Sequence, residues 1–232
     1  MPLRGGSFLA IWNDIDGITP VAYDAWLTHE HMDERLGVPG FLRGRRFVAS
    51  DDLPHRYFIC YETQDAGVLT SPAYLERLNH PTPLTQRVMP CLTNFLRMGC
   101  RTVGSAGQHV GGALVTLRFR APVEQVEHAA QRLCDALVQK TVLLGSHVGT
   151  PEAAVAAAPT RERELRPTIA HEGAEDHVLM VEGVNDVALR AEVPAILEAL
   201  QTHIGGASPV VARVYALSLL VDPPRPDNNE TT

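Results

Sequence analysis

Two histidines stand two residues apart near the end of a helical segment, and imidazole is the side chain best suited to moving protons near neutral pH. They are His29 and His31, in a run that begins at Trp26. On a regular α-helix two such positions lie about 200° apart around the axis. They therefore cannot face one point, which disfavours a metal site built from both. At most one of them is expected to act as a general acid/base.

The two positions differ in their predicted surroundings. His29 falls on the same helical stripe as Trp26 and Met32, which predicts a histidine at the edge of the core, bonded to backbone. His31 lies on another stripe, with Leu27, where it is either exposed to solvent or directed into a pocket. We take His31 as the first catalytic candidate and His29 as the second.

Arginine and aromatic side chains near these histidines are candidates for binding a substrate. Arg43 and Arg45 alternate onto one face of a predicted strand, where a guanidinium can hold a carboxylate at two points. A solvated or ion-paired strand face is the alternative. The aromatic candidates, for which core packing is the alternative, are Trp12, Trp26, Tyr57 and Tyr61.

Metal and nucleotide motifs are absent from the sequence. The cysteines form no C-x-x-C pair and follow no zinc-ligand spacing: Cys60, Cys91, Cys100 and Cys134. The glycines of 104–107 and 111–112 resemble a phosphate cradle only by their number, and a connector explains them. The one lysine, Lys140, has no phosphate-loop context. We expect neither a metal nor an organic cofactor.

Composition restricts the partners. The 232 residues are 45% apolar and 20% charged, as in ordinary globular proteins. Twenty basic against 27 acidic residues give a net charge of −7, the wrong sign for holding nucleic acid or anionic lipid. No apolar run reaches the roughly 18 residues of a membrane span, and no leader peptide is evident. We expect a cytoplasmic monomer or homodimer with a small-molecule substrate.

The order of predicted elements repeats once along the chain. In the first half, strands are predicted at 7–15, 41–50, 56–63 and 103–110, with helical segments at 21–36, 73–79 and 84–98. In the second half, strands are predicted at 113–120, 142–148, 177–184 and 210–221, with helices at 123–140 and 187–200, the latter interrupted near Pro194. Each half therefore has the order β-α-β-β-α-β of the ferredoxin-like plan.

Two ferredoxin-like sheets packed against each other predict an α+β fold, a pseudodimeric α+β barrel within one chain. The halves span 1–112 and 113–222, and 223–232 is predicted to be a disordered tail. An insertion at 151–176 begins Ala-rich and passes into Thr-Arg-Glu-Arg-Glu-Leu-Arg. It predicts a surface helix, with a lid over a pocket as the alternative.

The first helix carries a resemblance to a known family. Trp26 is followed by His31, which stands eight residues before a Pro-Gly pair at Pro39 that leads into a strand. This arrangement resembles the EthD-like branch of the dimeric α+β barrel superfamily, which usually carries its helix histidine at that place. The resemblance covers the chain to about Gly112, and the second half only through topology, since its first helix offers only His128.

The resemblance implies a small pocket between sheet and helices in the first half. Relatives of this fold include lactone isomerases, cofactor-free oxygenases, polyketide cyclases, dehydratases and haem-binding enzymes, so fold alone does not select a reaction. We expect isomerase, lyase or cyclase chemistry on a small aromatic or lactone-like carboxylated metabolite, with His31 as general acid/base. The alternatives are a cofactor-free or haem-dependent oxygenase in the same pocket and a non-catalytic ligand-binding or stress-related module.

Overall fold

Eight antiparallel strands form a closed barrel in the computed structural model, which describes residues 3–157, 159–166 and 176–224. Around the barrel the order is β1-β3-β2-β8-β5-β7-β6-β4. The strands are β1 (Ser7–Ile15), β2 (Phe41–Val48), β3 (Tyr57–Thr63), β4 (Leu92–Gly107), β5 (Ala113–Arg120), β6 (Leu143–Pro151), β7 (His177–Gly183) and β8 (Ser208–Val221). Each half contributes four adjacent strands in the same internal order. The predicted α+β barrel of two ferredoxin-like repeats is confirmed.

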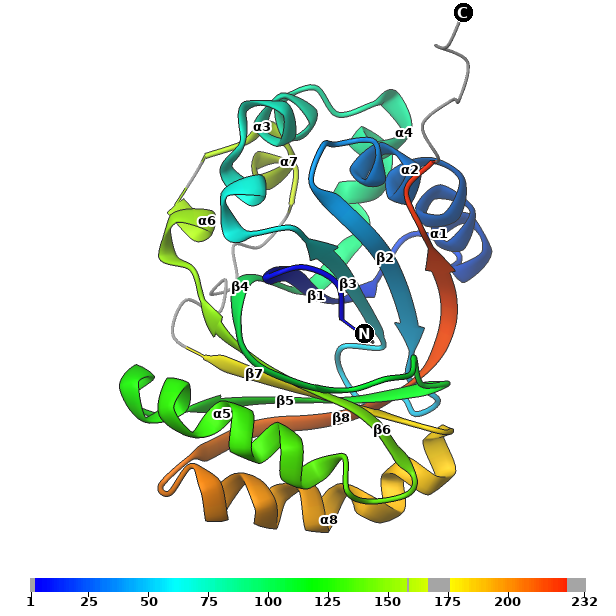
Figure 1. Ribbon diagram of the computed structural model, residues 1–232. Helices are drawn as coiled ribbons and strands as arrows, with labels where there is room; N and C mark the ends of the chain where they lie inside the picture. Colours follow the sequence, from blue (N-terminus) through cyan, green and yellow to red (C-terminus); the bar gives the residue numbers. More distant parts are fainter. Residues whose placement is uncertain (1–2, 158, 167–175, 225–232) are drawn as a thin grey trace, which may run out of the picture.

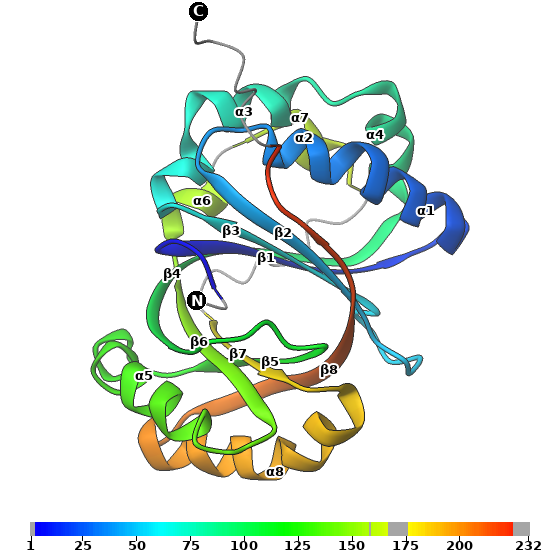
Figure 2. The ribbon, with the colours of Figure 1, turned by 45° about the vertical axis from the view of Figure 1, so that its right-hand side comes forward.

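The helices cover the outer faces of the two half-sheets, on opposite sides of the barrel (Figure 1). Those of the first half are α1 (Pro20–Trp26), the π-helical turn η1 (Leu27–His31), α2 (Met32–Leu36), η2 (Ala66–Thr70), α3 (Pro72–Asn79), α4 (Pro83–Val88) and η3 (Met89–Cys91). The second half has α5 (Val123–Leu137) and α8 (Asp186–His203), and the insertion holds α6 (Ala153–Ala157) and α7 (Arg161–Glu164). Both α6 and α7 lie beside the first-half helices, far from α5 and α8 (Figures 1 and 2).

The segment before the fourth strand and the last helix differ from the sequence prediction. The helix expected over 84–98 ends at Val88, and β4 begins at Leu92. Leu96, Met98 and Cys100 are spaced two residues apart and all belong to the interior core, which is the period of a strand and not of a helix. The α8 helix passes through Pro194 without interruption.

Alternate residues of each strand face the barrel interior and the helices. On β1, Phe8, Ala10 and Trp12 belong to the interior core, whereas Leu9 and Ile11 pack under the first-half helices. The interior core draws side chains from both halves. A side chain's position along its strand therefore decides whether it can reach a pocket under the helices.

An interior charge cluster is buried among these apolar residues: Arg45, Glu62, His147 and Glu182. Arg45 Nε lies 2.9 Å from Glu62 Oε1, and Arg45 Nη1 lies 2.7 Å from Glu182 Oε1. Burial acts to raise the pKa of Glu182, but Arg45, His147 and the backbone N–H of Gly111 outweigh it and lower the pKa to about 2. The cluster ties β2 and β3 of one half to β6 and β7 of the other.

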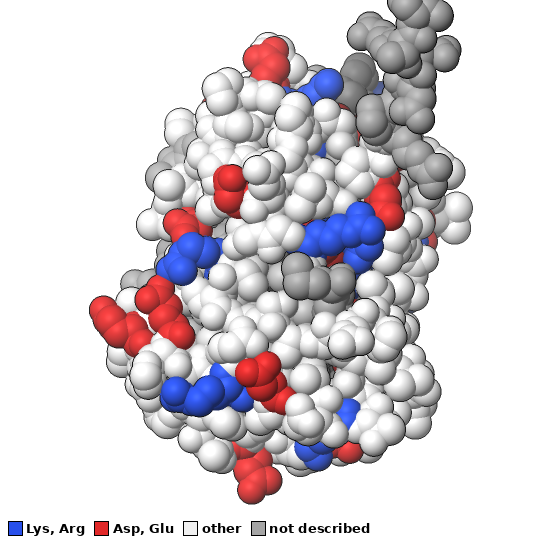
Figure 3. Space-filling model, in the orientation of Figure 1, with Lys and Arg blue, Asp and Glu red and all other residues white. Residues whose placement is uncertain are grey.

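The surface carries charges of both signs. On the face shown in Figure 3, basic and acidic groups are interspersed rather than gathered into one basic patch. No helix that the structure describes is long and apolar enough to cross a membrane. Most of the tail predicted to be disordered, 223–232, lies outside the described residues.

We expect residues 1–112 expressed alone to be insoluble or to self-associate. The seams pair β2 with β8 and β4 with β6, so separation exposes two strand edges and the interior face of the sheet. Light scattering after size-exclusion chromatography and denaturant unfolding measure the outcome. A stable monomer of 1–112 that unfolds cooperatively would show that the halves are independent domains.

Candidate functional site

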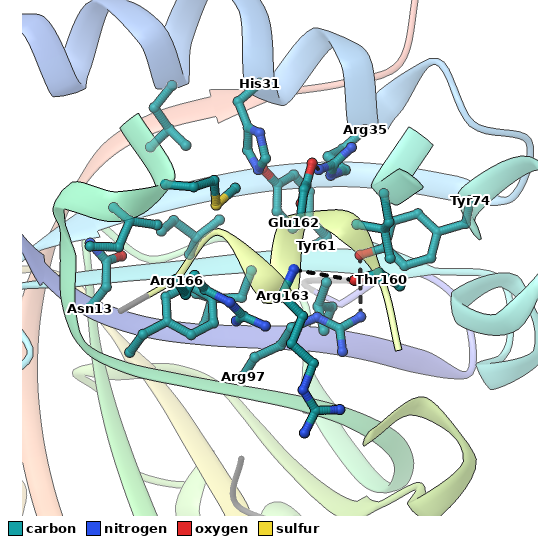
Figure 4. Close-up of a pocket in the computed structure, with 18 of the residues that line it drawn as sticks. Asn13, His31, Arg35, Tyr61, Tyr74, Arg97, Thr160, Glu162, Arg163 and Arg166 are labelled. Atoms are coloured by element: carbon teal, nitrogen blue, oxygen red, sulfur yellow. Dashed lines mark hydrogen bonds and ion pairs between the residues drawn. The ribbon is translucent and has the colours of Figure 1, made fainter. Parts of the chain in front are cut away.

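A cavity of about 60 Å³ lies between the helix-facing side of the first-half sheet and the helices above it (Figure 4). Residues of β1 and β3, including Leu9 and Ile59, form the sheet side, and η1 and α2 form the opposite wall. The insertion closes a further side, with Val155 of α6 and Glu162 of α7 among the lining residues. The insertion therefore does not simply lie on the surface, as the favoured sequence interpretation had it; part of it covers this cavity.

The π-helical turn orients the histidine at the cavity wall. The backbone N–H of Met32 donates to the carbonyl of Leu27, five residues earlier, which widens the turn. In a regular α-helix Trp26 and His31 would lie about 140° apart; here their ring centroids are 4.4 Å apart. Isolated π turns within α-helices occur frequently at functional sites.

His31 is a neutral, enclosed imidazole. It is 6% exposed, and its Nδ1 is buried without a hydrogen-bond partner among the described residues. Burial, and then the positive charge of Arg35, hold the pKa of His31 well below its ordinary value. A neutral imidazole with a free ring nitrogen can accept a proton or a hydrogen bond from a ligand.

His29 occupies the opposite environment from the one predicted. Its side chain is exposed and does not line the cavity. The prediction placed His29 on the buried stripe of Trp26 and Met32 because it assumed 3.6 residues per turn. The wider π turn moves His29 off that stripe, which leaves His31 as the histidine in the site.

Arg35 follows His31 by one turn and is almost fully buried, at 2% exposure. Its guanidinium donates to the carboxylate of Glu162 and lies 3.5 Å from Glu34 Oε1. Burial acts to lower the pKa of Arg35, but Glu162, Tyr74 and Glu34 outweigh it and raise the pKa above its ordinary value. The group therefore stays a cation inside the site.

The two arginines predicted to bind substrate lie elsewhere. Arg45 belongs to the interior charge cluster, and Arg43 Nε donates to Asp222 Oδ1 at 3.1 Å. Neither lines the cavity. The face of β2 that carries these two arginines turns into the barrel interior, whereas the cavity lies on the side of the sheet that faces the helices. The alternation of residues in the sequence does not distinguish these two faces.

Arginines other than these two line the cavity, and the sequence pattern did not predict them. The charged lining residues are Arg35, Arg97, Glu162, Arg163 and Arg166 (Figure 4). A guanidinium that lines a cavity can bind an anionic ligand by exchanging one of its present partners for it. The spacing of Arg35 from His31, four residues along one helix, was the available sequence signal. The Arg/Glu alternation of the insertion was instead interpreted as a solvated surface.

Two of the four predicted aromatic residues line the cavity, Trp26 and Tyr61. The Tyr61 hydroxyl is buried without a hydrogen-bond partner among the described residues, and burial raises its pKa. Tyr57 instead packs on Tyr23, with ring centroids 4.6 Å apart. Trp12 lies in the barrel interior, where its Nε1 donates to a threonine of β5.

No protein-family model and no curated protein sequence matches the chain. Solved structures do. An anthrone oxidase-like protein superposes with a TM-score of 0.60 at 12% identity, covering 93% of this chain and 92% of that one. A putative monooxygenase from Fusobacterium nucleatum gives 0.56 at 11% identity, covering 95% and 96%. A chlorite dismutase mutant from Candidatus Nitrospira defluvii gives 0.51 at 9% identity, covering 93% and 92%. The chain has the dimeric α+β barrel fold. At these identities the likeness shows the fold of the barrel and not its reaction.

A haem does not fit the cavity of this barrel as its side chains stand. The indole of Trp26 and the pair of Arg35 with Glu162 occupy the surroundings of His31. In the part of the chain that the structure describes, no three His, Cys, Asp or Glu side chains are grouped so as to hold a metal ion.

Proposed function

We propose that this barrel is an enzyme that binds a small aromatic or lactone-like carboxylate in the cavity and moves a proton with His31. The observation that carries the proposal is the buried imidazole, whose Nδ1 has no partner among the described residues, in a cavity of aromatic walls and arginine side chains. Isomerase, lyase or cyclase chemistry follows from a base of this kind.

The proposed step is transfer of a ligand C–H or O–H proton to the His31 imidazole. The electron pair left behind is delocalised onto a ligand oxygen. The hydroxyl of Tyr61, which has no partner in the part of the chain that the structure describes, can donate a hydrogen bond to that oxygen. His31 and Tyr61 point toward one another at the cavity wall (Figure 4). Arg35 lowers the affinity of the imidazole for the proton, which favours its return to a different ligand atom. Such a return completes an isomerisation.

A second candidate function is cofactor-free oxygenation in the same cavity. It is favoured by the names of two structural neighbours, an anthrone oxidase-like protein and a putative monooxygenase. The first step is the same proton removal, after which the ligand carbanion passes electrons to molecular oxygen. Oxygen consumption during turnover separates this function from isomerisation. A non-catalytic binding module would bind the ligand but would neither isomerise it nor consume oxygen.

The assignment to the EthD-like branch is part of the proposal and rests on Trp26 and on the spacing of His31 from Pro39. A cytoplasmic location and a monomeric or homodimeric state are also proposals. So is the division at residue 112, with the reactive site in the first half only. A small-molecule partner is the one that a cavity of this kind accommodates.

The pH dependence tests the state of His31. Because its pKa is depressed, we expect kcat/KM to stay level from about pH 8 to below pH 6.5, the ordinary value for imidazole. In ¹⁵N NMR spectra the His31 ring should keep its neutral pattern over that range. The unfolded chain binds more protons than the native protein below that pH, so the free energy of unfolding should fall there. A His31 ring that titrates near pH 6.5 would contradict the proposed buried base.

A further inference from the structure

The Arg35 guanidinium, one helical turn from His31, is already paired with a carboxylate from a distant part of the chain. Glu162, which is 127 residues from Arg35 in sequence, reaches it from α7 and is itself only 6% exposed. The α7 helix belongs to the second half but lies against the first-half helices (Figure 2). A side chain of the insertion thus places a carboxylate inside the cavity.

We propose that Arg35 binds the carboxylate of the ligand and that Glu162 occupies this position when no ligand is bound. This inference rests on the proposed function and names the ligand group and the residue that selects it. Binding is then an exchange of one carboxylate for another on the same guanidinium.

The position of Arg35 suits this role. Residues four apart on a helix share one face and are separated by about 6 Å along the axis. A ligand held through its carboxylate at Arg35 therefore brings its neighbouring atoms close to His31. The Tyr74 ring, 5.8 Å from the Arg35 guanidinium carbon, supplies an aromatic wall at the same place. An aromatic carboxylate matches both the cation and the wall.

Exchange also explains how a buried arginine can take part in binding. Leaving a buried cation without a counter-charge is strongly unfavourable, whereas substituting one carboxylate for another keeps Arg35 paired. A neutral ligand of the same shape cannot replace Glu162 without that penalty. The site would therefore discriminate carboxylates from their amides.

Of the two acids near Arg35, Glu162 is the one that a ligand carboxylate can replace. Glu34 sits on the same helix, next to Arg35 in sequence, and cannot leave. Burial first, and then the nearby Glu162 charge, raise the pKa of Glu34 against the opposing effect of Arg35, so the two acids compete for one cation. Glu162 lies on a helix of only four residues outside the barrel, where Arg161 N–H donates to Asn79 Oδ1 at 3.1 Å.

The experiment compares Glu162→Gln with wild-type protein by calorimetric titration with benzoate and benzamide. The substitution keeps the size of the side chain and removes its charge. We expect benzoate to bind at least tenfold more tightly to Glu162→Gln than to wild type, with no such gain for benzamide. Glu164→Gln is the matched control, because Glu164 is on the same helix but is exposed and paired with Arg161 at 2.9 Å. It should bind both probes as wild type does.

Hydrogen exchange gives an independent measurement on the unmodified protein. Saturating benzoate should speed exchange of the amides of 161–166, because displaced Glu162 no longer holds α7, and benzamide should not. The proposal is overturned if benzoate binds to Glu162→Gln within twofold of its affinity for wild type, or if neither protein binds benzoate. It is also overturned if saturating benzoate leaves hydrogen exchange of 161–166 in wild type unchanged. If the benzoate effects appear but His31→Gln leaves turnover intact, the proposed function fails and the exchange at Arg35 stands.

Discussion

His31→Gln should lower turnover by roughly 10²–10⁴-fold and leave the fold intact. Glutamine occupies a similar volume and can hydrogen-bond, but it cannot take up a proton. The imidazole Nδ1 has no partner among the described residues, so the substitution breaks no hydrogen bond there. The measurement is steady-state kinetics on a panel of small aromatic carboxylates and lactones, with circular dichroism to check the fold.

His29→Gln is the control within the same π turn. Because His29 is exposed, we expect its substitution to leave turnover unchanged and to alter the free energy of unfolding by no more than about 0.5 kcal/mol. The sequence pattern predicted that His29 lies at the edge of the core, where its loss would lower stability, and its exposure removes that reason. Equal losses of turnover in both variants would mean that the turn as a whole matters, not the His31 imidazole.

The repeated order of elements could be predicted from the sequence because it depends on local patterns. Short apolar runs, as in β3 and β5, and amphipathic segments, as in α5, each indicate their own conformation within a few residues. The ferredoxin-like plan then follows from the order alone. His31 was selected by its spacing from Pro39, and the structure places it at the cavity wall.

The cavity lining could not be predicted in the same way, because it depends on contacts between distant segments. Arg35 meets Glu162 across 127 residues, and nothing in either local pattern indicates the pairing. The insertion was interpreted as solvated because its charges alternate, yet Glu162 is buried there. The π turn adds one residue to a helical repeat, which changes the exposure of His29 and His31 without changing the composition of the segment.

Two arginines of β2, Arg43 and Arg45, show a related limit of prediction from the sequence. Alternation identifies which residues of β2 share a face, and Arg43 and Arg45 do so. It does not say whether that face meets helices or the interior of a closed barrel, because both are buried. Arg45 is fully buried among carboxylates rather than at the cavity. A buried arginine is therefore not by itself an indicator of a binding site.

Arg45→Met is expected to cost about 3–5 kcal/mol of the free energy of unfolding, because it leaves Glu62 and Glu182 without their buried cation. Urea unfolding at pH 7 measures the loss. Arg101→Met is the control: Arg101 pairs with Glu127 and Glu152, but its side chain is 48% exposed, so about 0–1 kcal/mol is expected. Similar losses in both variants would show that the interior charge cluster adds no more than a surface ion pair.

The pH dependence of the Arg45→Met loss identifies its cause. Without the arginine, burial and mutual repulsion should raise the pKa values of Glu62 and Glu182 above those of the unfolded chain. Groups with raised native pKa values stabilise the folded state below their unfolded value, about 4.3, and lose that contribution as the pH rises. The variant should therefore approach wild-type stability toward pH 4 and fall away from it toward pH 7.

Replacing Arg45, Glu62 and Glu182 together by Met removes the charges altogether, so it should recover much of the loss at pH 7 and abolish this pH-dependent difference. A loss that is independent of pH would assign the effect to packing around the introduced methionine side chain rather than to the unpaired carboxylates.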